Sequence, residues 1–374
     1  MRDGWKAVTT PLASIFGSGF LIIVPVLAGA VGPYSLIAMA AVCALAFAVG
    51  SVIRFNIAEA EPVLAGPPHQ PTLSFERMAD FALIVAYVIS VCLYLHILSS
   101  FVLLGLGAES AVGENLLTSA VIIAITAIGI WKGLAALAAL EKWALYVTFL
   151  IIALLLGGFG LYDIEAMRSQ EGLRLPEMPD RTTWEILTIL GGTLIVVQGF
   201  ETPRYLGKAF DAVSRIAASR LSQVISTVVY LLFVALATPI VTGLNGTYSD
   251  NSLITMTQIA AAGLVIPLVI AAALSQFSAA VADTFSAIGS IEQVSHGHVQ
   301  MKWGCLLVGG GALALTWSAD TLEILALASR AFAFYYTLQC FVAISVSTSL
   351  QQKAYFAAIA VVLSFITLFA VPAG

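Results

Sequence analysis

The sequence has few charged residues. Asp, Glu, Lys and Arg together make up 10% of its 374 residues, hydrophobic residues make up 60%, and the mean hydropathy is +0.99. Soluble domains are about one-quarter charged. The composition therefore excludes an ordinary soluble protein and predicts an all-α polytopic membrane protein, with the lipid bilayer as a partner.

Cysteine is scarce as well. Cys43, Cys92, Cys305 and Cys340 all lie in apolar segments without a Cys-x-x-Cys pair, so we interpret them as small core residues rather than disulfides or metal ligands. The sequence also lacks a basic run, a nucleophile–base arrangement, a metal cluster and a phosphate loop. Neither a nucleic-acid partner, nor an enzyme activity, nor a cofactor is predicted.

Apolar runs near the length that a bilayer requires divide the chain into eleven predicted spans. A single transmembrane domain is predicted over 1–346, and 347–374 form an additional C-terminal helix. A short helix at 251–262 is expected outside the bilayer core. The predicted spans are 12–31, 34–53, 78–106, 116–131, 143–161, 184–210, 221–241, 264–288, 305–317, 322–346 and 354–371.

The distribution of lysine and arginine predicts the orientation. With the N-terminus in the cytoplasm, only Arg168, Arg174 and Arg181 lie in outside loops, and the other loop lysines and arginines lie inside. An odd number of spans then places the C-terminus outside. The predicted location is the bacterial inner (plasma) membrane, and the sequence gives no indication of the oligomeric state.

Two of the spans contain residues that break helices. In the sixth, Gln198-Gly199-Phe200-Glu201 is followed by Thr202-Pro203, a helix-cap and first-turn signal. In the first, Thr10-Pro11 is a similar signal for the start of the span, and Phe16-Gly17-Ser18-Gly19-Phe20 allows the backbone to leave the helix. Backbone groups freed inside a membrane need polar partners, and transporters use such breaks to bind a substrate or an ion.

The two breaks predict an inverted repeat. Positions 17 and 200 differ by 200 − 17 = 183 residues, and the same offset carries spans two to five onto spans seven to ten. Five spans per repeat place the second copy upside down, as in many secondary transporters. The predicted repeats are 9–162 and 183–346. The alternative is that glycine and proline merely kink these helices for packing.

At these residues the chain resembles the amino acid–polyamine–organocation (APC) superfamily, whose members share the leucine-transporter fold. The tripeptide Gly17-Ser18-Gly19 is similar to the Gly-Ser-Gly motif of the family's first helix, and Gly199-Phe200-Glu201 is similar to the motif of its sixth. The resemblance covers spans one to ten. It implies that amides after Gly17 bind a substrate carboxylate and that carbonyls near Phe16 and Gln198 bind its amino group.

Further substrate and ion residues are implied by the same resemblance. Tyr94 maps to the third helix, which lines the substrate site in relatives. Relatives coupled to sodium bind it between first-helix carbonyls, here Ala13 and Phe16, and hydroxyls of the eighth helix, here Ser275 and Ser278. Oxygen ligands suit a hard cation. The alternative is that both serines bond to carbonyls of their own helix.

The residues themselves point to the same site. The N-terminal end of the half-helix near Phe20 favours an anion, and the carbonyls near Gln198 favour a cation, so together they suit a zwitterion. Glu201 either takes up a proton, pairs with a cation, or only holds the break through the freed amides. Asp283 is a further ion-coupling candidate.

Two other polar residues lie in spans. Arg330 needs an anion, with Asp283 and Glu201 as candidates, and structural pairing is its expected role. His96 is expected to be packed and hydrogen-bonded rather than functional.

These features predict an ion-coupled secondary transporter for a small amino acid or related organic solute, driven by H⁺ or Na⁺. A channel, a passive facilitator and a transporter-like receptor are the alternatives. A channel would show a continuous polar stripe, which the scattered polar residues do not form.

Overall fold

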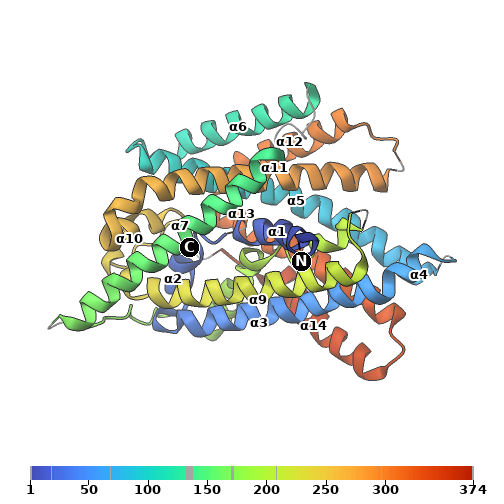
Figure 1. Ribbon diagram of the computed structural model, residues 1–374, viewed down its shortest axis with the longest axis horizontal. Helices are drawn as coiled ribbons and strands as arrows, with labels where there is room; N and C mark the ends of the chain where they lie inside the picture. Colours follow the sequence, from blue (N-terminus) through green and yellow to red (C-terminus); the bar gives the residue numbers. More distant parts are fainter. Residues whose placement is uncertain are drawn as a thin grey trace.

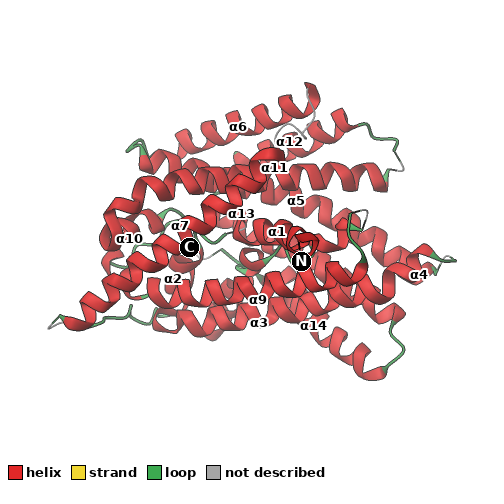
Figure 2. Cartoon of the chain, viewed as in Figure 1, coloured by secondary structure: helices red, strands yellow, loops and turns green. Residues whose placement is uncertain are grey.

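The computed structural model describes residues 2–17, 19–67, 69–131, 138–169, 172–207, 209–295 and 297–372. These ranges form helices joined by turns and loops and contain no strand (Figure 2). The all-α prediction is confirmed.

The first half of the chain contains a divided helix followed by four long ones (Figure 1). Its elements are α1 (Arg2–Gly17), α2 (Ile23–Val31), η1 (Gly32–Tyr34), α3 (Ser35–Phe55), the π turn η2 (Asn56–Ala60), α4 (Glu61–Ala65), α5 (Gln70–Gly105), α6 (Ala111–Trp131) and α7 (Ala138–Arg168).

The second half begins with another divided helix. Its elements are α8 (Thr183–Gly191), η4 (Leu194–Val197), η5 (Thr202–Leu206), α9 (Ala212–Ala237), η6 (Pro239–Leu244), α10 (Ser252–Ala261), η7 (Ala262–Leu264), α11 (Val265–Val294), α12 (Met301–Thr316), α13 (Thr321–Val346) and α14 (Leu350–Phe369). The short α10 occupies the segment that the sequence placed outside the bilayer core.

The start of the first helix differs from its prediction. Thr10-Pro11 was expected to begin it, but α1 starts at Arg2 and contains Pro11. Proline inside a helix removes one backbone hydrogen bond. Val8 and Leu12 are both buried, so packing holds the helix on either side of Pro11.

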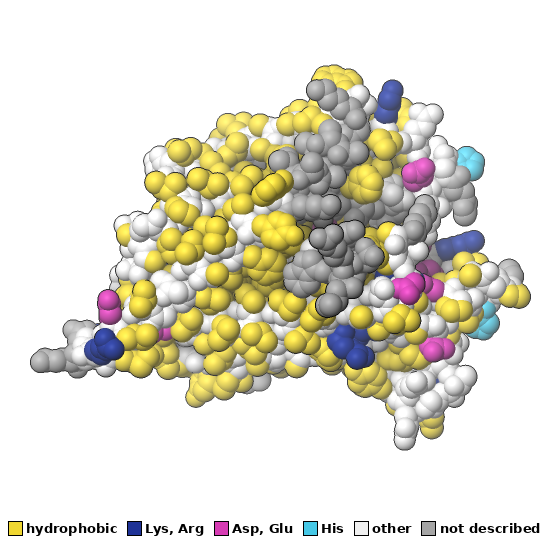
Figure 3. Space-filling view, in the orientation of Figure 1, with side chains coloured by type: hydrophobic (Ala, Val, Ile, Leu, Met, Phe, Trp, Pro, Cys, Tyr) yellow, Lys and Arg dark blue, Asp and Glu magenta, His cyan; other side chains and the backbone are white. Residues whose placement is uncertain are grey.

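The surface and the helix lengths agree with a membrane protein. Eight helical segments in the described residues are long and apolar enough to cross a membrane. The other predicted spans correspond to the two divided helices and to α12, which has 16 residues. On the face in Figure 3, hydrophobic side chains cover the middle, and most charged ones lie toward the two ends of the long axis.

The element order follows the predicted repeat. The 183-residue offset carries the helix α7 onto α13. It likewise relates α3 to α9, α5 to α11 and α6 to α12. The contacts of α1 with α9 and of η4 with α3 are exchanged by such a repeat, while α5 packs on α11 and α6 on α12. Superposition of the two halves about a two-fold axis is the direct test, so the symmetry itself stays a prediction.

The centre of the fold is the helix α5. It packs against α6, α11, α12 and α13, and the two breaks lie beside this group where α1, η4 and η5 meet (Figure 1). The four cysteines are free and buried, as expected.

Candidate functional site

The break in the first helix separates α1 from α2 and is closely packed. A Cβ atom on Gly17 would lie 2.7 Å from Cβ of Ala279 in α11. Gly19 has a φ of 147°, and a Cβ there would lie 2.9 Å from Cγ2 of Val196 in η4. Only glycine allows these approaches, so the bare backbone of this break contacts both α11 and the sixth helix. Ser18, a predicted substrate residue, lies outside the described residues.

Three consecutive amides of this break are unpaired. Within the described residues, the amides of Gly19, Phe20 and Leu21 donate no hydrogen bond, although the Gly19 carbonyl accepts one from Ile22. All three residues are buried. Buried amides without acceptors are rare in native proteins. They lie just before the N-terminus of α2, where the helix dipole favours an anion.

The break in the sixth helix is longer than predicted. The α-helix ends at Gly191, one turn of 3₁₀-helix covers Leu194–Val197, and the backbone is extended at Gln198. The next segment is the 3₁₀-helix η5, whose cap residue is Glu201 rather than Thr202. The predicted cap was therefore off by one residue. The η5 segment is a 3₁₀-helix that begins at Thr202 itself. Its cap residue makes no side-chain hydrogen bond to the first turn, so Thr202 does not act as a side-chain cap.

Serine side chains from two other helices satisfy the backbone of this second break. The Ser329 hydroxyl in α13 accepts from the Ile195 amide at 3.1 Å and donates to the Gly192 carbonyl at 2.6 Å. The Ser219 hydroxyl in α9 donates to the Phe200 carbonyl at 3.0 Å. These bonds replace those that the interrupted helix has lost.

Tyr230 in α9 joins the two breaks. Its hydroxyl contacts the Val196 carbonyl at 2.7 Å and the Ile15 carbonyl at 3.1 Å. The backbones also touch, because a Cβ on Gly199, whose φ is 120°, would lie 2.8 Å from the Ile15 amide nitrogen. The two breaks thus form one continuous structure.

Glu201 is fully buried at the second break. Its Oε2 accepts from the Gly199 amide at 2.9 Å and from the Tyr336 hydroxyl at 2.8 Å. Its Oε1 has no hydrogen-bond partner among the described residues. One oxygen therefore holds the break, and a carboxyl group buried in this way still needs a proton or a cation at the other.

The neighbouring predicted residues extend this site. The Gln198 side-chain amide donates to the Tyr94 hydroxyl of α5 at 3.1 Å, and both residues are buried. The Phe200 ring stacks on Tyr336 with 5.3 Å between the centroids. The structure thus brings Tyr94, Gln198 and Phe200 together around Glu201.

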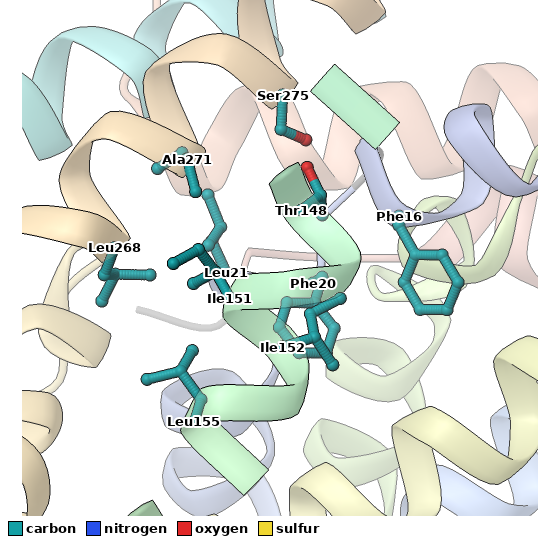
Figure 4. Close-up of a pocket in the computed structure, with 11 residues that line it drawn as sticks. Phe16, Phe20, Leu21, Thr148, Ile151, Ile152, Leu155, Leu268, Ala271 and Ser275 are labelled. Carbon is teal, nitrogen blue, oxygen red and sulfur yellow. The ribbon is translucent and has the colours of Figure 1, made fainter. Parts of the chain in front are cut away.

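The predicted sodium ligands line two different cavities. A cavity of about 10 Å³ is lined by Phe16 and Ser275, and Figure 4 shows the hydroxyls of Ser275 and Thr148 near each other at one end of it, beside apolar side chains. A second cavity, of about 50 Å³, is lined by Ala13 and Ser278. The first has room for about one water molecule.

Two other predicted residues, Thr202 and Asp283, line the second cavity. Ala279, which contacts Gly17, lines it as well. Thr284 bonds to the carbonyl four residues before it, at 2.7 Å, whereas the described residues show no such bond for Ser275 or Ser278. The hydroxyls of these two serines are therefore not used by their own helix.

Comparison with known proteins agrees with this geometry. A family model described as APC superfamily transporter matches residues 1–370. The chain belongs to the APC superfamily of transporters. An uncharacterized protein of Aquifex aeolicus, strain VF5, is 35% identical over 378 residues, which cover 98% of this chain and 90% of that protein.

A solved structure shows a similar fold. It is the crystal structure of a mutant manganese transporter from Eremococcus coleocola, with a TM-score of 0.55 and 14% sequence identity. The match covers 97% of this transporter and 86% of that chain.

Three other polar residues of the transporter's spans were singled out in the sequence: Asp283, Arg330 and His96. Asp283 is buried and accepts a hydrogen bond from the Ser90 hydroxyl of α5. Arg330 was expected to pair with Asp283 or Glu201, but it is exposed and donates to the Thr367 carbonyl of α14 at 2.8 Å. The prediction was wrong because its position on α13 faces α14 rather than the breaks. His96 is buried, and its Nε2 has no partner among the described residues.

Ion pairs anchor the transporter's segment after the second break. Arg204 of η5 bonds to Glu76 of α5 at 2.8 Å and also donates to Gln339 of α13. Arg215 of α9 pairs with Glu61 of α4 at 2.6 Å and donates to the Arg204 carbonyl at 3.0 Å. Charged contacts thus join several helices at this end, which is predicted to be cytoplasmic.

The loop that leads into α9 is also capped. The Asp211 side chain accepts from the Ser214 amide at 3.0 Å. Hydrogen bonds from the Ser214 hydroxyl and then its amide hold the pKa of Asp211 below its usual value. This cap sets where α9 begins, at Ala212, three residues before Arg215.

Sequence reasoning missed four residues of the transporter's site: Ser219, Tyr230, Ser329 and Tyr336. All are buried polar side chains within apolar helices. Polar residues inside a span are a general signal for function. Their partners lie far away in the sequence, so the signal does not assign them to a break.

Proposed function

We propose that this membrane transporter is an ion-coupled secondary transporter for a small amino acid or related organic solute, working by alternating access. One observation carries the proposal. Among the described residues, the buried amides of Gly19, Phe20 and Leu21 on the first break have no acceptor, and one carboxyl oxygen of Glu201 on the second break has no partner. The two breaks contact each other.

These groups prefer ligands of opposite charge. The three amides and the start of α2 favour a carboxylate. The Glu201 carboxyl group favours a cation or a proton. An amino acid carries a carboxylate and an ammonium group on one carbon atom. Its carboxylate matches the amides of the first break, and its ammonium group matches the carbonyls near Gln198 in the second break, which contacts the first.

Alternating access requires the packed breaks to separate. The cavity of about 10 Å³ beside Phe20 has room for one water molecule but not for an amino acid. Substrate entry therefore needs movement of α1 or η5 away from α11. On the predicted cytoplasmic side, that movement breaks the Arg204–Glu76 and Arg215–Glu61 pairs.

We favour protons as the coupling ion. Glu201 is fully buried, and binding a proton at Oε1 neutralises it without a further ligand. The predicted sodium ligands support sodium less well, because Ser275 and Ser278 line separate cavities. Sodium coupling remains the alternative that the experiment distinguishes.

The test is uptake of amino acids into proteoliposomes under separate proton and sodium gradients. Glu201→Gln keeps the shape but cannot ionise, so we expect it to eliminate pH-driven uptake while substrate exchange survives. Glu59→Gln, at an exposed glutamate, is the matched control and should transport normally.

Sodium coupling predicts a different pattern. Ser278→Ala would then weaken the sodium dependence without abolishing substrate recognition, and Glu201→Gln would have little effect. A strong sodium requirement with normal uptake by Glu201→Gln would show that the proton assignment is wrong.

Manganese ions are a necessary comparison in this assay. The Eremococcus coleocola protein is named a manganese transporter, but at 14% identity it supports the fold alone. Among the described residues, no three His, Cys, Asp or Glu side chains are grouped to hold a metal ion. Uptake of Mn²⁺ without uptake of any amino acid would overturn the proposed substrate class.

A further inference from the structure

One buried glutamine has no partner. Four glutamines are buried in the described residues, and three of them, Gln198, Gln223 and Gln339, form hydrogen bonds with other helices. Gln276 of α11 is fully buried, and neither its Nε2 nor its Oε1 has a hydrogen-bond partner in the described structure. Burying an amide without partners costs free energy, so another molecule is expected to meet it in the working protein.

The position of Gln276 follows from its neighbours on α11. Val269, seven residues before it, lies 2.9 Å from a Cβ built on Gly105 of α5. Asp283, seven residues after it, accepts from Ser90 of α5. Residues seven apart share a helix face, so Gln276 lies midway along the face of α11 that packs on α5.

The same residue lies next to the first break. Ala279, three residues after Gln276, contacts Gly17, and the Ser275 carbonyl lies 4.0 Å from a Cβ built there. On the opposite helix, α5 contributes Tyr94, which bonds to Gln198 of the second break. Gln276 thus lies on the side of α11 between the first break and α5.

We propose that Gln276 is a specificity-determining residue that binds the side chain of the substrate. This inference rests on the proposed function: the backbone amides of the first break bind the carboxylate that all amino acids share, and Gln276 binds the group that differs. It identifies the substrate as an amino acid with an uncharged polar side chain.

The chemistry of the amide selects this class. Its nitrogen donates and its oxygen accepts. A carboxamide side chain satisfies both atoms, and a hydroxyl does so with a single atom. An ammonium group pairs only with the oxygen, a carboxylate pairs only with the nitrogen, and an alkyl chain pairs with neither. A site with unpaired polar groups rejects analogues that cannot pair them.

The experiment compares Gln276→Met with Gln339→Met in the purified full-length protein. Methionine keeps the length of the side chain and removes its hydrogen bonds. Gln339 has partners on two other helices, so its variant should lower the Tm of the ligand-free protein. Gln276→Met should leave that Tm unchanged or raise it, because no hydrogen bond is lost.

Ligand binding is then measured with glutamine, asparagine and serine against leucine and methionine. Wild type should prefer the polar group. Gln276→Met should weaken binding of glutamine by about ten- to a hundredfold and change binding of leucine by less than about threefold. Proteoliposome uptake should show the same loss of preference.

The outcomes separate the two proposals. If wild type transports leucine and glutamine equally well and Gln276→Met changes neither, the inference is wrong and the proposed function stands. A fall in Tm equal to that of Gln339→Met, with unchanged selectivity, assigns Gln276 a structural role and also overturns it. If no amino acid binds wild type, both proposals fall.

Discussion

The two helix breaks differ in what holds them. The first is shaped by close backbone contacts at Gly17 and Gly19, and the amides of Gly19, Phe20 and Leu21 have no acceptor among the described residues. The second is held by side chains from α9 and α13, including Ser219 and Ser329, and by its own Glu201. Both interruptions occur in a helix, yet one leaves backbone groups open and the other satisfies them.

This difference indicates a division of roles. A break whose groups are already paired is a scaffold, because a ligand would have to displace existing bonds. A break with unpaired amides gains hydrogen bonds only when a ligand arrives. We therefore expect substitutions at the first break to affect binding, and substitutions of the side chains that hold the backbone of the second break to affect stability.

The largest effect is expected at Gly17. Gly17→Leu should abolish substrate binding in a folded protein, because its side chain would clash with Ala279 and displace the backbone of the break from α11. The smaller Gly17→Ala should also weaken binding, since its Cβ would lie 2.7 Å from that of Ala279. Thermal shift with substrate is the measurement.

A second substitution tests the cause. Ala279→Gly removes the atom that Gly17→Ala would strike, so the double variant should regain most of the lost affinity. Failure of the double variant to recover, in a protein with normal Tm, would mean that the contact with α11 is not what requires glycine at this position.

Tyr230 tests the connection between the breaks. Tyr230→Phe removes the hydroxyl that bonds to Ile15 and Val196, and leaves two buried carbonyls with one partner fewer. We expect a loss of about 2 kcal/mol of stability, together with weaker substrate binding, because both breaks shift. Chemical denaturation in detergent and ligand titration measure the two effects.

An exposed tyrosine provides the control. Tyr355, whose hydroxyl bonds to Ser51 at 3.1 Å, lies at an exposed position on α14, and Tyr355→Phe should change neither quantity. A Tyr230→Phe variant as stable as this control would contradict the bridging role.

The existence of both breaks was predictable because their cause is local. Gly17, Gly19 and Gly199 have contacts or φ angles that other residues do not tolerate, and glycine in an apolar span indicates this directly. Glu201 was predictable for a similar reason, since a carboxylate inside a span is costly. The family resemblance then placed these residues on the first and sixth helices.

The partners of the breaks were not predictable because they depend on tertiary packing. Tyr230 and Ser329 lie in apolar helices where such residues are common, and their targets are backbone atoms, which carry no residue type to match. The early end of α8 at Gly191 had a local signal, the pair Gly191-Gly192, which the sequence analysis did not use. The bond from the Ser329 hydroxyl to the Gly192 carbonyl, by contrast, depends on tertiary packing.

The smallest effect is expected at Ser329, and it tests the scaffold role alone. Ser329→Ala leaves the Ile195 amide and the Gly192 carbonyl without this partner, which should cost about 1–2 kcal/mol of stability. Substrate affinity should change by less than about threefold, because the groups involved face α13 and not the first break. Ser318→Ala, at an exposed serine just after α12 whose hydroxyl bonds to the Ala314 carbonyl, should change neither. A tenfold loss of affinity in Ser329→Ala at normal stability would mean that the second break binds substrate through this segment as well, and that the two breaks do not divide the roles in this way.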